Sequence, residues 1–136
     1  MPGIPSFFAV IVRSMPLFSA LSNDEVGEII NRATPAYAKA GSDVLVEGEL
    51  AGEPLYVVTN GCVEVLKGGQ LVAELGSGQW FGEMALIEQK PRNATVRAKT
   101  DCEFYVFSRS AFLDFVTKYP HMRSTIDATY QARKNN

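Results

Sequence analysis

The sequence has few of the residues that metal and redox sites need. Its 136 residues include one histidine, His121, and two cysteines, Cys62 and Cys102. The cysteines lie in separate apolar runs rather than in a C-x-x-C pair, which predicts reduced thiols in strands and not a disulfide or a metal site. One histidine cannot supply the several ligands of a metalloenzyme built on a β-barrel. No metal is therefore expected.

Excess positive charge and long apolar runs are also absent. Thirteen lysines and arginines face fifteen acidic residues, and no basic stripe stands out, so no nucleic-acid partner is expected. The apolar run 7–12 is too short to span a bilayer and has no basic region before it. The sequence thus predicts a cytoplasmic chain without direct membrane contact, and it carries no signal for an oligomeric state.

Catalytic motifs are missing as well. No H-E-x-x-H, G-x-S-x-G or Walker A pattern occurs in the sequence. Gly76, Gly78 and Gly82 resemble a dinucleotide-binding loop, but the third glycine comes one position late and no βαβ pattern surrounds it. The chain is therefore not expected to be an enzyme.

What the sequence does contain is one domain's length of ordinary globular composition, with 46% apolar and 21% charged residues. Residues 1–33 are expected to form a helical lobe. A short helix is expected over 6–14, and Ser22 with Glu25 forms a capping box that starts a second helix, which runs to about Arg32.

Short β-rich runs separated by glycine-containing turns fill residues 34–109, a pattern typical of a small β-barrel or jelly roll. Lys67-Gly68-Gly69-Gln70 is expected to be a hairpin turn, and strands are expected over 94–98 and 102–107. Residues 110–136 return to a helical pattern. Ser110 is expected to cap one helix and Pro120 to begin another.

The run 81–98, FGEMALIEQKPRNATVRA, has the chemistry of a site for a small anion. Gly82 allows close approach of the backbone, and the start of a short helix over 84–87 offers free N–H groups to negative charge. Arg92 supplies a planar fork of donors that suits two phosphate oxygens. Glu83 would repel a phosphate, but it can accept hydrogen bonds from a neutral ribose hydroxyl. Together these groups indicate a nucleotide.

This run resembles the phosphate-binding cassette of cyclic nucleotide-binding domains, which occur in regulatory subunits of cAMP-dependent protein kinase, in bacterial catabolite activator protein and in cyclic-nucleotide-gated channels. That cassette reads approximately F-G-E-x-A-L, a short spacer, then P-R-x-A-T/S-V, and each fixed position is matched in residues 81–96. The resemblance extends over most of the chain, except its first dozen and last few residues.

The resemblance implies a mainly β fold with flanking helices. This fold is a jelly-roll β-barrel with an N-terminal helical lobe, an internal cassette helix and C-terminal lid helices. The resemblance also implies that Arg92 binds the cyclic phosphate, that Glu83 binds the ribose, and that Gly82 and Ala85 are backbone donors. The ligand-binding residues that it implies are Gly82, Glu83, Met84, Ala85, Arg92, Asn93 and Ala94.

Some assignments stay open at this point. Asn93 can both donate and accept, so it fits either purine; we favour cAMP because the cassette resembles the kinase and bacterial type, with cGMP as the alternative. Thr95 either contacts the phosphate or favours the strand. Trp80 and Phe81 are expected to pack at the barrel mouth rather than to stack on the base. The lid over the base is expected among Met122, Ile126 and Tyr130.

The expected function is a cyclic nucleotide sensor whose helices transmit a conformational change to an effector domain or a partner protein. One alternative is a protein-interaction domain of the same fold that has lost its ligand, although Glu83 and Arg92 are both intact. Another is an excised regulatory domain of a channel or other multidomain protein. A DNA-binding regulator is not expected, because a helix-turn-helix unit needs roughly 60 further residues.

Overall fold

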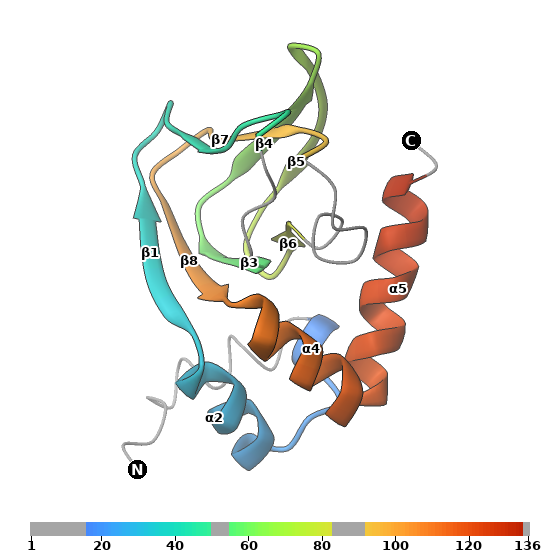
Figure 1. Ribbon diagram of the computed structural model, residues 1–136. Helices are drawn as coiled ribbons and strands as arrows, with labels where there is room; N and C mark the ends of the chain where they lie inside the picture. The colour runs from blue at the N-terminus through green and yellow to red at the C-terminus, as the bar shows by residue number, and fades with distance from the viewer. Residues whose placement is uncertain (1–15, 50–54, 83–91, 135–136) are drawn as a thin grey trace.

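The computed structural model describes residues 16–49, 55–82 and 92–134 (Figure 1). The helix expected over 6–14 and the cassette helix expected over 84–87 lie outside these residues. In the described part, eight strands and four helical segments follow the expected order of helices, strands and helices.

The strands form two antiparallel sheets of four strands each. The first sheet has the order β1 (Thr34–Ala38), β8 (Cys102–Phe107), β3 (Leu55–Asn60) and β6 (Trp80–Phe81). The second has the order β2 (Asp43–Leu45), β7 (Thr95–Ala98), β4 (Val63–Lys67) and β5 (Gln70–Leu75). Apart from the hairpin pair β4 and β5, neighbouring strands in each sheet are distant in the chain, as in a jelly roll. The expected mainly β fold is confirmed, as two sheets within the described residues rather than one closed cylinder.

The hairpin expected at Lys67-Gly68-Gly69-Gln70 is confirmed. Lys67 pairs with Gln70 across β4 and β5, and the two glycines between them have φ angles of 58° and 79°. Left-handed φ at both central positions matches the twist of the flanking strands, and glycine adopts it without the steric cost of a Cβ atom.

Three longer helices flank the sheets: α2 (Asn23–Asn31), α4 (Arg109–Lys118) and α5 (Pro120–Lys134). A 3-10 turn, η1 (Pro16–Phe18), precedes them. The capping box before α2 is confirmed, because the Glu25 N–H donates to Ser22 Oγ at 3.2 Å and the Ser22 N–H donates to Glu25 Oε1 at 2.9 Å. The start of α5 at Pro120 is also confirmed.

The cap expected at Ser110 is wrong, because Ser110 lies inside the first turn of α4. The N-cap is Ser108, whose Oγ accepts a hydrogen bond from the Ala111 N–H at 3.1 Å. Strand β8 ends at Phe107, so Ser108 is the first residue after the strand that keeps an extended backbone, with φ −65° and ψ 163°. Both serines suit a cap by type, and the end of the strand decides between them.

The buried side chains form two clusters. One fills the space between the helices and the first sheet, where Phe107 of β8 meets Phe115 of α4 with ring centroids 5.5 Å apart. The other lies between the two sheets and includes Val58, Val96 and Phe104. Consecutive residues of β6 serve different clusters, Trp80 the first and Phe81 the second. Strand β6 therefore connects the helical layer to the interior of the sheets.

Polar contacts attach the C-terminal half of α2 to α4. Arg32 Nη1 donates to Asp114 Oδ2 at 2.6 Å. Glu28 Oε2 accepts from Lys118 Nζ at 2.9 Å and from the Tyr119 hydroxyl at 3.1 Å. These hydrogen bonds, that from Lys118 first, hold the pKa of the Glu28 carboxyl below its ordinary value.

We predict that Ser108→Ala lowers the free energy of unfolding by about 1 kcal/mol, because the Ala111 N–H loses its acceptor at the helix start. Ser110→Ala, two residues further along, is the matched control and should cause no loss of stability, since alanine is the better helix former. Urea denaturation of both variants measures the difference. An equal loss in the two variants would contradict the position of the cap.

We also predict that Glu28→Gln makes stability less sensitive to acid. Because the folded-state pKa of Glu28 is lowered, its contribution is complete above the ordinary pKa of about 4.5 and disappears as the pH falls through the folded value. The difference in melting temperature between wild type and variant should be present at pH 7 and shrink towards pH 3. A difference that stays constant with pH would show that Glu28 acts by packing alone.

Candidate ligand-binding site

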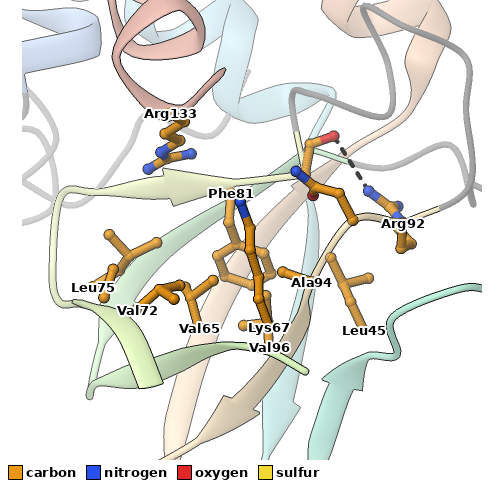
Figure 2. Close-up of a pocket in the computed structure, with 13 residues that line it drawn as sticks. Leu45, Val65, Lys67, Val72, Leu75, Phe81, Arg92, Ala94, Val96 and Arg133 are labelled. Atoms are coloured by element: carbon orange, nitrogen blue, oxygen red, sulfur yellow. Dashed lines mark hydrogen bonds between the residues drawn. The ribbon is translucent and has the colours of Figure 1, made fainter. Parts of the chain in front are cut away.

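A pocket opens on the inner face of the second sheet and is closed on one side by the end of α5 (Figure 2). Its walls bound about 700 Å³ of space, which includes open solvent at the mouth. Apolar side chains from β2, β4, β5 and β7 line it, among them Leu45, Val65, Leu75 and Val96. The polar side chains that line it are Lys67, Arg92, Asn93 and Arg133.

Arg92 is the best-fixed polar group of the pocket. The residue is 6% exposed, and among the described residues it is the one charged residue in the buried class. Nη1 donates to the Gly82 carbonyl at 3.2 Å. Its backbone N–H donates to the Glu49 carbonyl at 2.9 Å, and its carbonyl accepts from the Gly48 N–H at 2.8 Å. The turn at 46–49 thus holds the Arg92 backbone, and the Gly82 carbonyl holds its guanidinium, at the pocket wall.

Gly82 follows strand β6 and turns the chain towards Arg92. Its φ angle of 97° lies in the left-handed region, where glycine is favoured. In this conformation its carbonyl faces the guanidinium, and the residue itself lines the pocket. The glycine at this point of the cassette is therefore a conformational requirement.

Aromatic packing fixes the wall beside Gly82. Phe81 stacks on Tyr56 with centroids 4.9 Å apart and meets Phe104 edge-on at 5.7 Å. Burial raises the pKa of the Tyr56 phenol, and the nearby Arg92 charge partly offsets that rise. Trp80 is buried in the helical cluster, so packing is supported for both aromatic residues, while Phe81 also lines the pocket.

The structure brings four of the seven predicted site residues together. Gly82, Arg92, Asn93 and Ala94 all line the pocket; Asn93 is exposed and Ala94 is buried. The other three, Glu83, Met84 and Ala85, lie outside the described residues.

Thr95, the first residue of β7, is not among the residues that line the pocket. Its Oγ1 accepts a hydrogen bond from the Glu47 N–H at 3.0 Å, which supports the strand interpretation of this residue over contact with a phosphate. The bond also joins β7 to the turn at 46–49 that holds Arg92.

Two polar residues of the pocket were missed by sequence reasoning. Arg133 reaches it from the last turn of α5, and its Nη2 donates to the Trp80 carbonyl at 2.7 Å. It continues the stripe of Met122, Ile126 and Tyr130 by one more helical step, so the stripe already pointed to it. Met122 and Ile126 are themselves buried in the helical core.

Lys67 is the second missed residue. It follows Val63 and Val65 at the strand period of two, which places its side chain on the same inner face.

Metal-binding and membrane-spanning features are not found in the described ranges. No three histidine, cysteine or acidic side chains gather there as a metal ion would need. None of the described helices has the length and apolar character required to cross a membrane. Cys62 and Cys102 are both free thiols, the second one buried.

Comparison with known proteins identifies the class of domain. The sequence model of the family described as "Cyclic nucleotide-binding domain" matches residues 36–119, and the chain belongs to this family. It is 32% identical over 117 residues to the human potassium/sodium hyperpolarization-activated cyclic nucleotide-gated channel 4. The aligned stretch covers 86% of this chain and 10% of the channel.

A second relative points the same way, and a solved structure shares the fold. The chain is 31% identical over 128 residues to the cAMP-dependent protein kinase regulatory subunit of Schizosaccharomyces pombe, covering 88% of this chain and 31% of that subunit. The fold also matches the regulatory domain of Toxoplasma gondii PKA crystallised with cAMP, with a TM-score of 0.77, 23% identity and coverage of 96% of this chain and 50% of that one. The chain thus spans at most about a third of these two curated relatives.

We predict that Thr95→Val lowers the free energy of unfolding by about 1 kcal/mol, because the Glu47 N–H loses its acceptor while the side-chain volume is kept. Thr95→Ser retains the hydroxyl and is the matched control. Chemical denaturation of the two variants tests this. If Thr95→Ser were the more damaging change, the methyl group rather than the hydrogen bond would matter.

Proposed function

We propose that this chain is a sensing module that binds a cyclic nucleotide, with cAMP as the favoured ligand. The observation that carries the proposal is the buried Arg92, whose backbone and side chain are both fixed at the wall of an apolar pocket. Burying a guanidinium is costly unless an anion or hydrogen-bond acceptors compensate for lost water. A cyclic phosphate supplies one negative charge and two acceptor oxygens, which match the donor fork of arginine.

The remaining cassette residues complete the proposed site. Gly82 and Ala85 donate backbone N–H groups to the phosphate, and Met84 and Ala94 lie against the ligand. Glu83 accepts from the ribose 2′-hydroxyl, and Asn93 stands at the mouth of the pocket near the phosphate. The apolar side chains of β4, β5 and β7 receive the purine, whose faces are apolar and whose edges are polar.

The output of the module is the C-terminal helix pair. Helix α5 contributes Met122 and Ile126 to the helical core and Arg133 to the pocket. The Arg133 side chain donates a hydrogen bond to the Trp80 carbonyl. Ligand that contacts Arg133 favours one position of α5 over another, and a tenfold preference corresponds to about 1.4 kcal/mol. The helix then transmits this preference to an effector domain or partner protein.

The competing functions fit the site less well. A protein-interaction domain without a ligand does not require an apolar pocket with a cation at its wall. Catalysis is not proposed, because no nucleophile paired with a base lies among the described residues that line the pocket. The relatives are regulatory subunits and channels, so a regulatory role within a larger protein is consistent with the proposal.

Calorimetric titration of ligand-stripped protein tests the proposal directly. We expect wild type to bind cAMP and cGMP, and Arg92→Ala to weaken binding by roughly tens to thousands of fold, because the phosphate loses a charge-assisted pair and stays desolvated. Arg97→Ala is the control: Arg97 is exposed on the same stretch of chain and pairs with Asp43 at 2.8 Å, outside the pocket. Absence of binding at millimolar nucleotide would contradict the sensing function.

A further inference from the structure

Lys67 is a cation of the pocket that the family cassette does not include. It ends strand β4, and Leu66 before it pairs with Thr95 of β7, so Lys67 lies level with Ala94. Its side chain faces inward with Val65 because residues alternate along the strand. Figure 2 shows the side chain extended across the pocket, with its nitrogen on the side from which Arg133 approaches.

Among the described residues, the surroundings of the Lys67 ammonium leave it available to a ligand. Within the described residues no salt bridge or side-chain hydrogen bond involves it, although the residue is half-buried. None of the described side chains that line the pocket is acidic, and its neighbours Val65, Val72 and Phe81 are apolar. An ammonium beside apolar walls gains from acceptor atoms on a bound molecule.

The cyclic phosphate does not need this second cation, since Arg92 already fills that role at the other side of the pocket. The part of the ligand that extends away from Arg92, towards β4, β5 and α5, is the base. We therefore infer that Lys67 contacts the edge of the purine and acts as a selectivity residue. This inference rests on the function proposed above and refines its base preference.

The chemistry of the two purines sets the direction of the effect. Guanine presents two acceptors side by side, N7 and O6, whereas adenine presents the N7 acceptor beside the N6 amino donor. An ammonium only donates, so it can bond to both guanine atoms but meets a like donor beside N7 of adenine. Lys67 therefore raises the affinity for cGMP relative to cAMP and reduces the cAMP preference of the cassette.

The test measures a ratio of affinities rather than a single affinity. Ligand-stripped wild type, Lys67→Met and Lys67→Arg are titrated with cAMP, cGMP and cyclic inosine monophosphate, which keeps O6 and N7 but lacks the 2-amino group. Lys67→Met keeps the length of the side chain and removes the charge. Lys39→Met is the matched control, because Lys39 is exposed and outside the pocket.

We expect Lys67→Met to weaken the binding of cGMP and of cyclic inosine monophosphate by about tenfold more than the binding of cAMP. Lys67→Arg should retain the wild-type ratio of these affinities. Equal losses for all three ligands would overturn the inference, since they would indicate long-range attraction of the phosphate or a damaged fold. A loss confined to cGMP would place the contact at the 2-amino group and would overturn it too.

Two outcomes separate this inference from the function on which it rests. Wild type that binds none of the three nucleotides contradicts the sensing function itself. Wild type that binds them, with a ratio unchanged in Lys67→Met, leaves the sensing function intact and removes only the role of Lys67. Thermal unfolding checks that each variant is folded, and Lys67→Gln replaces Lys67→Met if the latter is not.

Discussion

The arrangement of the whole site depends on holding one buried cation at the wall of an apolar pocket. Arg92 is fixed at three points: by the Gly82 carbonyl on its side chain, and by Gly48 and Glu49 on its backbone. Because the side chain is already fixed before a ligand binds, less side-chain entropy is lost on binding. The left-handed turn at Gly48 and the hydrogen bond from Glu47 to Thr95 are the local structures that keep this support in place.

Strand β6 is where the site meets the rest of the molecule. Only two residues long, it directs Trp80 into the helical cluster and Phe81 into the cluster between the sheets. The Trp80 carbonyl receives the hydrogen bond from Arg133, and Gly82, one residue after Phe81, receives that from Arg92. A displacement of this strand would therefore move both the pocket cation Arg92 and the last turn of α5.

The features predicted best from sequence were those set by neighbouring residues. The capping box at Ser22 and Glu25 and the two-glycine hairpin need only their own backbone geometry to form. The cap at Ser108 was misplaced because its position depends on where β8 ends, which pairing with β1 and β3 decides. Arg133 and Lys67 are far from the cassette in sequence, and only the packing of α5 and β4 around one hollow brings them to it.

The pocket's charge distribution limits what it can bind well. Among the described residues that line it, Lys67, Arg92 and Arg133 carry positive charge and none carries negative charge. Such a pocket disfavours cations, and a neutral apolar molecule would gain nothing from the positive charges at its wall. A nucleotide with one phosphate satisfies Arg92 and still presents base acceptors on its far side. A ligand that places its anion and its acceptors at opposite ends therefore uses the pocket more fully than either a free phosphate or a free base.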